Sequence, residues 1–273
     1  MNIGIEIGGT KLQLATGDPA TGKIDQIYRY RVDKAQGAQG ILAQIDETLQ
    51  SLPQQPSRIG IGFGGPVNRQ TGVIATSHQI GGWSGFDLKK WVKERFDVPA
   101  LIDNDANVAA LGEAHFGAGK EHELVFYITL GSGVGGGMVI NGQLYHGNVP
   151  GEAEVGLLQL DRDGNTLESY CSGWALDAKI RALLPSLPAP SILKQLIGAQ
   201  QSGEAQFLLT AFHQGDHTAA QLLKDYTDTL AWGLSHVVHL FNPQIIVLGG
   251  GVSLIGEALR IRVQEALPKY LVK

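Results

Sequence analysis

The sequence predicts an α/β fold with two related lobes, and three observations support this prediction. Short apolar strands open each half of the chain, at 3–7 and 124–130, and both lead into a glycine-rich turn. Stretches with apolar residues at helical spacing alternate with further strands. The 273 residues are also enough for two domains of ordinary size, each with its own core. We therefore expect two lobes that face one cleft.

The first third of the chain predicts a sheet with helices packed on it. Residues 3–7 and 12–15 alternate with period two around Gly8-Gly9-Thr10, which is typical of a β-hairpin. The elements expected next are strand 24–32, helix 41–52, strand 59–63, helix 88–96 and strand 100–102. This order of strands followed by alternating helices predicts the α/β class.

The second half repeats the opening of the first. Strand 124–130 leads into the glycine turn 131–137, and a hairpin follows around Asn141-Gly142, which is the strongest two-residue hairpin turn. The elements expected beyond it are a loop with a short helix at 183–203, helix 219–241, strand 245–248 and helix 255–270. Two similar openings, each at the head of half a chain, predict two related lobes.

Composition and charge exclude several classes of protein. The chain is 43% hydrophobic and 17% charged, as in soluble globular proteins, and no apolar run approaches the roughly 20 residues that a membrane span requires. The net charge of −5 argues against nucleic acid as a main partner. One helical stretch is basic, and a solvated face explains it best: Lys89, Lys90, Lys93 and Arg95. The N-terminus starts in a strand pattern without a signal peptide, so we expect a cytoplasmic protein.

Cysteine and histidine usage gives no metal site. Cys171 is the single cysteine, so it forms no internal disulfide, and we expect it to be a small buried residue. His236 and His239 lie three apart, and His213 and His217 lie four apart, which are spacings compatible with a metal. No carboxylate or cysteine completes either pair to the three or four ligands needed, so these histidines are expected to be structural or exposed.

The segment LIDNDANVAALGE, residues 101–113, places polar groups between a strand and a helix. Asp103, Asn104 and Asp105 follow the apolar strand end, where α/β proteins collect catalytic groups. Asp and Asn are also favoured helix N-caps in any protein, so capping is the alternative interpretation.

Three glycine-rich loops follow apolar strands and favour a nucleotide site. Glycine lets backbone amides approach phosphate oxygens without a Cβ between them. Residues 131–136 satisfy G-x-G-x-x-G, but a hairpin follows them instead of the helix that a dinucleotide-binding fold requires. The sequence has no G-x-x-x-x-G-K-[ST] motif either, so a P-loop protein is excluded.

Six segments, in this order and spacing, resemble the ROK family of sugar kinases and repressors: GIEIGGTKLQLA, IGFGGPV, IDNDANVAALGE, ITLGSGVGGG, AEVG and IVLGGGVS. The resemblance extends over essentially the whole chain. It implies the two-lobed actin/hexokinase-like (ribonuclease H-like) ATPase fold, with residues 1–114 plus 257–273 in the N-terminal lobe and 115–256 in the C-terminal lobe. It also implies a homodimer.

The resemblance implies a role for individual residues. Asp105 would be the general base that takes the proton from a sugar hydroxyl as this attacks the γ-phosphate of ATP. Glu6 would bind Mg²⁺, through water. The residues implied to bind the sugar, besides Asp105, are Gly64, Gly65, Asn104, Glu154 and Glu168. The residues implied to bind ATP are Gly8, Gly9, Thr10, Lys11, Gly131, Ser132, Gly133, Gly249, Gly250 and Gly251.

The chain departs from the family pattern at the structural zinc site. Most members have histidine after E-I-G and a cysteine-rich segment soon after it, whereas here Glu154-Val155-Gly156 is followed by Leu157 and the cysteine segment is missing. We therefore expect no zinc, with Leu157 packed as an apolar substitute. Gln79 stands where asparagine is common, which alters a secondary sugar contact.

The first hypothesis is an ATP- and Mg²⁺-dependent hexose kinase, with glucose as the default acceptor at its 6-hydroxyl. Fructose, N-acetylmannosamine and N-acetylglucosamine are alternative acceptors, and polyphosphate is an alternative donor. A sugar-responsive repressor would need a winged-helix domain ahead of the first strand, for which we expect no room. A non-catalytic sugar-binding protein of the same fold is the alternative from another class.

Overall fold

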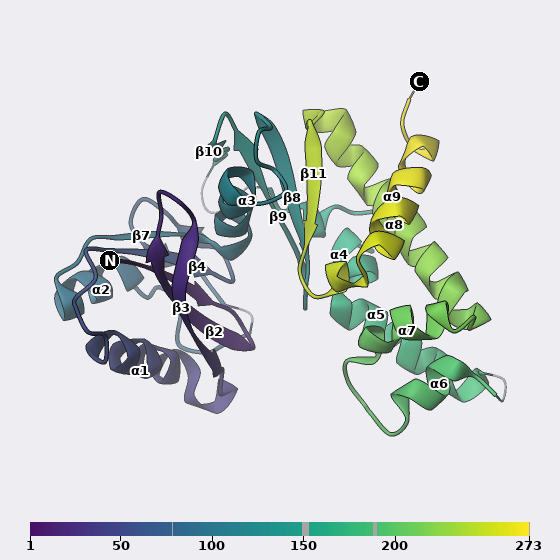
Figure 1. The fold of residues 1–273 in the computed structure, drawn as a ribbon, viewed down its shortest axis with the longest axis horizontal. Coiled ribbons are helices and arrows are strands. Elements are labelled where there is room, and N and C mark those ends of the chain that lie inside the picture. Colours follow the sequence, from purple (N-terminus) through teal and green to yellow (C-terminus); the bar gives the residue numbers. More distant parts are fainter. Residues whose placement is uncertain (78, 149–152, 188–189, 273) are drawn as a thin grey trace. The chain divides into compact units, whose positions relative to one another are not determined.

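The computed structural model describes residues 1–77, 79–148, 153–187 and 190–272. The chain divides into two compact units (Figure 1). Unit 1 comprises Met1–Glu123 and Gly137–Ala153, and unit 2 comprises Leu124–Gly136 and Glu154–Lys273. Strands and helices alternate along the chain, in agreement with the predicted α/β class.

Unit 1 contains a five-stranded sheet in the order β3-β2-β1-β4-β7. Its strands are β1 (Asn2–Ile7), β2 (Lys11–Asp18), β3 (Lys23–Arg31), β4 (Arg58–Phe63) and β7 (Ala100–Asn104). The first three strands pair antiparallel, whereas β4 pairs parallel with β1 and β7 pairs parallel with β4. The last paired residues of these parallel strands are in register, since Ile7 is opposite Phe63 and Phe63 is opposite Asn104.

The two faces of this sheet have different coverings. Alternate strand residues such as Ile5 and Ile61 are buried in one core with residues of α1 (Gly37–Gln50) and α2 (Leu88–Phe96). The opposite face carries Gly62, which lies against the start of α3 (Asp105–Phe116). Glycine at position 62 gives α3 a close approach, because a Cβ there would lie 3.3 Å from the Cα of Asp105.

A small additional hairpin joins β5 (Val67–Asn68) to β6 (Val73–Ile74) in unit 1. The sequence analysis did not anticipate it, because a strand of two residues is too short to show a period.

The second sheet has the order β10-β9-β8-β11. Its strands are β8 (Leu124–Leu130), β9 (Val134–Ile140), β10 (Gln143–Leu144) and β11 (Ile245–Gly249). The predicted turn at Asn141-Gly142 joins β9 to β10, and both residues have the positive φ that this turn requires, 51° and 74°. Strand β11 pairs parallel with β8.

The helices of unit 2 are α4 (Leu167–Cys171), α5 (Gly173–Leu183), α6 (Ile192–Ile197), α7 (Leu208–His213), α8 (His217–Phe241) and α9 (Glu257–Ala266). The expected short helix and the long amphipathic helix correspond to α6 and α8. Short 3-10 helices complete the structure, at Lys34–Gln36, Val155–Leu157, Leu184–Ser186, Glu204–Phe207, Val252–Ile255 and Leu267–Lys269.

The last helix differs from the expected domain division. The family resemblance implies that residues 257–273 belong to the N-terminal lobe, whereas in the structure this segment groups with unit 2. The physical reason is that α9 packs along α8, with Leu259 and Val263 buried. In the part of the chain that the structure describes, every helix is too short or too polar to cross a membrane.

Candidate functional site

The Asp-Asn-Asp segment lies where β7 ends and α3 begins, and the structure assigns the capping role to its central residue. The Oδ1 atom of Asn104 accepts hydrogen bonds from the amides of Ala106 at 2.9 Å and Asn107 at 3.4 Å. The side-chain amide of Asn104 donates to the carbonyl oxygen of Gly65 at 3.3 Å. Because Asn104 caps α3, the carboxyl group of Asp105 is not needed as the N-cap.

The carboxyl group of Asp105 lies against the end of β4. A Cβ on Gly64 would lie 3.2 Å from its Oδ2 atom, so glycine at position 64 gives this oxygen room. The pKa of Asp105 is raised to about 6: burial is the largest cause and the negative charge of Glu6 adds to it, while the Ala106 amide and Lys11 act in the opposite direction. A carboxylate with such a pKa holds a proton more readily than an exposed one and still ionises near neutral pH.

The first glycine loop lies at the same edge of the sheet as Asp105. Strands β1, β4 and β7 are parallel and end in register, so the segments that follow them emerge together. These segments carry Gly8-Gly9-Thr10, Gly64-Gly65 and Asp105. Unit 1 therefore brings together the predicted phosphate loop, the backbone predicted to bind sugar and the predicted base.

The hairpin turn of the first loop leaves amides available to an anion. The amide of Gly8 donates to the carbonyl oxygen of Lys11 at 3.0 Å. Within the described part of the chain, no hydrogen bond engages the amide of Gly9 or Thr10. A backbone turn with unengaged amides suits phosphate oxygens.

Glu6 and Gln79 complete the surroundings of this loop. The Glu6 carboxylate pairs with the Lys11 ammonium at 3.1 Å and accepts a hydrogen bond from Gln13. Gln79 lies directly over Gly9, because a Cβ on Gly9 would lie 1.5 Å from the side-chain oxygen of Gln79. The sequence analysis did not predict this contact, since the loop and Gln79 are 70 positions apart in the chain.

The second and third glycine loops lie together in unit 2. Thr129 near the end of β8 is opposite Gly249 at the end of β11, so both loops emerge at one edge. Gly250 has a φ of +83°, and a Cβ on it would lie 2.6 Å from backbone atoms of Leu130. The predicted nucleotide-binding residues thus divide between the two units.

Glu168 is engaged with the second loop. Its Oε2 atom accepts a hydrogen bond from the amide of Val134 at 2.8 Å, and a Cβ on Gly133 would lie 2.5 Å from the same atom. This carboxylate therefore fixes the end of the Gly131–Gly133 turn. The family resemblance implies a sugar contact for Glu168, and no local pattern in the sequence indicates this backbone contact.

The region that replaces the family's zinc site differs from the expectation. Leu157 is 62% exposed, so its predicted packing as an apolar substitute is wrong. Gly156 takes the inner position of the 3-10 turn, where a Cβ would lie 2.0 Å from the carbonyl oxygen of Val134, and Leu157 is left on the outside. Glu154 lies at the exposed start of the same turn.

The described residues contain no group of three or more His, Cys, Asp or Glu side chains that could hold a metal ion. Cys171 is fully buried, as expected. The Glu6 carboxylate suits Mg²⁺ because its oxygens are hard ligands, and it is partly exposed beside the first loop.

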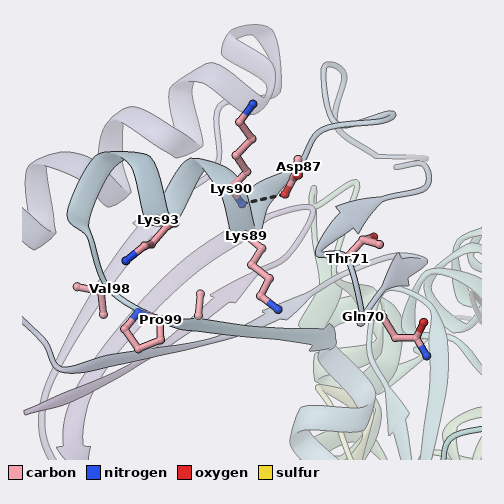
Figure 2. A pocket seen from close by; sticks show the side chains of 9 residues that line it. Gln70, Thr71, Asp87, Lys89, Lys90, Lys93, Val98 and Pro99 are labelled. Carbon is pink, nitrogen blue, oxygen red and sulfur yellow. Dashed lines mark hydrogen bonds between the residues drawn. The ribbon is translucent and has the colours of Figure 1, made fainter.

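Two pockets of unit 1 lie away from this edge. One of about 740 Å³ is lined by residues such as Asn2, Arg58 and Ala100, at the beginnings of β1, β4 and β7. The other, of about 400 Å³, lies under α2 beside Pro99 (Figure 2). Both lie at the opposite end of the parallel strands from Asp105, so neither contains the candidate site.

The chain is similar to known proteins over nearly its whole length. The family model "ROK family" matches residues 2–273. The chain is 29% identical to a glucokinase of Thermotoga maritima, covering 99% of this chain and 88% of that protein. It is 31% identical to a glucokinase of Streptomyces coelicolor, covering 100% of this chain and 88% of that protein.

A solved structure is similar over the same extent. It is a ROK family glucokinase from Streptomyces griseus in complex with glucose and AMPPNP, with a TM-score of 0.88 and 30% identity. The match covers 100% of this chain and 90% of that one, and it confirms the predicted fold class. A family match over nearly every residue, together with relatives above 30% identity, leads to one conclusion: the chain belongs to the ROK family.

Proposed function

We propose that this protein is a sugar kinase that transfers the γ-phosphoryl group of ATP to a hexose, with glucose as the default acceptor at its 6-hydroxyl. The observation that carries the proposal is the position of Asp105: a buried carboxylate with a raised pKa, at the same strand edge as the Gly8-Gly9-Thr10 turn. The glucokinases to which the chain is similar support the choice of substrates.

In the proposed mechanism the residues of unit 1 bind and activate the acceptor. The Asp105 carboxylate accepts the proton of the attacking hydroxyl, which contributes about 10²–10⁴-fold to such a reaction. Asn104 and the Gly64-Gly65 backbone hold the sugar by hydrogen bonds. The amides of Gly9 and Thr10 and the ammonium of Lys11 stabilise phosphate charge, which is the main requirement of phosphoryl transfer. Glu168 and Glu154 are proposed as further sugar contacts.

Magnesium is proposed to accompany ATP near Glu6. When bound, the ion neutralises charge on the phosphates. Glu6 holds it through water, and Gly131, Ser132, Gly133 and Gly249–Gly251 of unit 2 are proposed to bind the rest of the nucleotide.

ATP is proposed as the donor in preference to polyphosphate, because a long polyanion needs a continuous track of cations. Three of the four basic residues of α2 are paired, Lys90 with Glu94, Lys93 with Asp97 and Arg95 with Asp46. Figure 2 shows the Lys90 side chain directed away from those of Lys89 and Lys93. We expect phosphorylation of glucose with ATP and at least about tenfold slower turnover with polyphosphate at equal phosphate concentration. Faster turnover with polyphosphate would reverse this assignment.

The acceptor is tested by binding and by turnover. Purified protein is heated with glucose, fructose, N-acetylmannosamine or N-acetylglucosamine, each with ATP and Mg²⁺, and ADP release is measured in parallel. We expect glucose to give the largest rise in melting temperature, since a ligand at 100 times its Kd adds about 2.7 kcal/mol to the free energy of unfolding. Binding of a sugar without ADP release would favour the non-catalytic sugar-binding protein.

Turnover is expected to depend on pH through Asp105. Because the base must be ionised, and burial raises its pKa to about 6, kcat/KM should fall below this pH. The expected loss is about tenfold between pH 7 and about pH 5, as follows for one ionisation. The measurement is initial rate at limiting sugar across this range. A rate that stays constant down to about pH 4.5 would show that an ordinary, exposed carboxylate or no carboxylate is involved.

A further inference from the structure

We propose that Asp103 and His146 form a positioning pair, which fixes the turn that carries Asn104 and Asp105 and ties it to the segment after β10. This inference rests on the proposed function and extends it to two residues with no assigned role. Neither residue needs to touch the substrates. Both act through the neighbours that do.

The carboxylate of Asp103 makes hydrogen bonds with three different segments. Its Oδ1 atom accepts hydrogen bonds from the amide of Asn104 at 2.8 Å and from the side-chain amide of Asn107 at 2.9 Å. Its Oδ2 atom is 2.8 Å from Nε2 of His146, which lies 43 positions away in the chain. One side chain therefore joins the strand end, the buried first turn of α3 and the segment that follows the β9-β10 hairpin.

The environment makes this contact stronger than a surface ion pair. The side chains of Asp103 and His146 are only 16% and 24% exposed, so water screens their interaction less. A hydrogen bond to a carboxylate is roughly twice as strong as one between neutral groups. The amide of Tyr145 donates to the carbonyl oxygen of Met138 at 2.8 Å, which holds the residue before His146 on β9. The imidazole is thereby presented from a fixed backbone.

The contacts of Asp103 with Asn104 and Asn107 allow the pair to control the position of Asp105. Asn104 caps α3 and reaches Gly65, and its own amide is held by Asp103. A rotation of the Asp103 carboxylate would release Asn104 and Asn107 together, and the backbone at Asp105 would move with them. A displacement of about 1 Å at a reacting group can cost about 10²-fold in rate.

The test compares four single variants and one double variant with the unaltered chain. His146→Ala removes the donor, and His146→Gln restores a nitrogen donor at a similar reach. Asp103→Asn keeps the shape and replaces the carboxylate with a neutral amide, so the contacts with Asn104, Asn107 and His146 lose the negative charge that strengthens them. The matched control is His115→Ala, because His115 contacts Gly142 of the same hairpin at 2.8 Å and is remote from the Asp103 carboxylate in the hydrogen-bond network.

We expect His146→Ala to raise the KM for the sugar about tenfold and to lower kcat about threefold to tenfold, with the KM for ATP changed less than twofold. His146→Gln should recover most of this loss, and His115→Ala should match the unaltered chain. In the double variant, which carries Asp103→Asn and His146→Ala, the losses in kcat/KM should not add, since both substitutions act on the same contact. If His146→Ala had the same kinetic constants as His115→Ala, the proposal that Asp103 and His146 position the site would be overturned.

A second measurement needs no turnover. Amide hydrogen exchange of residues 103–108 should be faster in His146→Ala and Asp103→Asn than in the unaltered chain and His115→Ala. Unchanged exchange in both variants would overturn the positioning role whatever the activity. Absence of ADP release from the unaltered chain with every sugar, together with faster exchange in these variants, would overturn the proposed function and leave the structural pair established.

Discussion

Replacing Asp105 with Asn is expected to lower kcat for sugar phosphorylation by about 10²-fold or more, while the affinity for the sugar stays nearly unchanged. The amide keeps the shape and much of the hydrogen bonding of the carboxylate but cannot accept a proton. Asn104 supplies the N-cap, so α3 keeps its first turn in the variant. The measurements are kcat with saturating substrates and the melting-temperature shift that the sugar produces.

A control variant separates the loss of the base from the loss of a negative charge. Asp97→Asn makes the same change at an exposed position at the end of α2 and should leave kcat within about twofold. If Asp105→Asn also retained full turnover, Asp105 would not be the base and the proposed mechanism would be wrong.

The same substitution is expected to stabilise the folded protein at neutral pH. Burial raises the pKa of Asp105 from 3.8 to about 6 in the folded state, so the folded protein binds this proton more tightly than the unfolded chain. The stability associated with the protonated form is present below pH 3.8 and is lost as the pH rises through about 6. Asn carries no such penalty, so the free energy of unfolding at pH 7 should rise by on the order of 1–3 kcal/mol. Denaturant unfolding at about pH 4 and pH 7 measures the difference, which should vanish at the lower pH.

Replacing Gly250 with Ala is expected to lower the free energy of unfolding by about 2–3 kcal/mol and to weaken ATP binding. Position 250 has a φ of +83°, which an L-residue with a Cβ adopts only under strain, and the new methyl group would meet backbone atoms of Leu130 at 2.6 Å. Backbone atoms cannot rotate away as a side chain can. The end of β8 and the Gly131–Gly133 turn must therefore shift.

The neighbouring glycine provides the matched control for this substitution. Gly251 has φ and ψ of −62° and −36°, and a Cβ on it would meet nothing within 4 Å. Gly251→Ala should leave the free energy of unfolding within about 0.5 kcal/mol or raise it slightly, because alanine restricts the unfolded chain. Equal stabilities of the two variants in denaturant unfolding would contradict the close approach of Gly250 to β8.

Much of this fold was predictable because its signals are local. The turn at Asn141-Gly142 and the helix Leu88–Phe96 each depend on a few adjacent residues, and the structure has both as expected. The helices α4 and α5 escaped prediction because α4 has only 5 residues and Ser172 alone separates it from α5, which obscures a helical period. Leu157 was misassigned because its exposure depends on Gly156, which packs on a distant strand.

The candidate site was predictable in its residue types and less so in its contacts. The sequence analysis identified Asp105 and the glycine loops from their places after strands. Which residue of the Asp-Asn-Asp segment caps α3 was left open, because Asp and Asn are both good caps. The contacts of Gln79 with Gly9, Glu168 with Val134 and His146 with Asp103 join residues far apart in the chain, and no local pattern encodes such contacts.

Because Asn104 provides the N-cap, a complex with both unreacted substrates can be prepared from a variant with an intact helix. Helix integrity and proton acceptance reside on adjacent side chains, so one can be removed without the other. A crystal of the Asp105→Asn chain soaked with sugar and intact nucleotide is therefore the preparation in which to see both substrates, since they would be consumed about 10²-fold more slowly than by the unaltered chain.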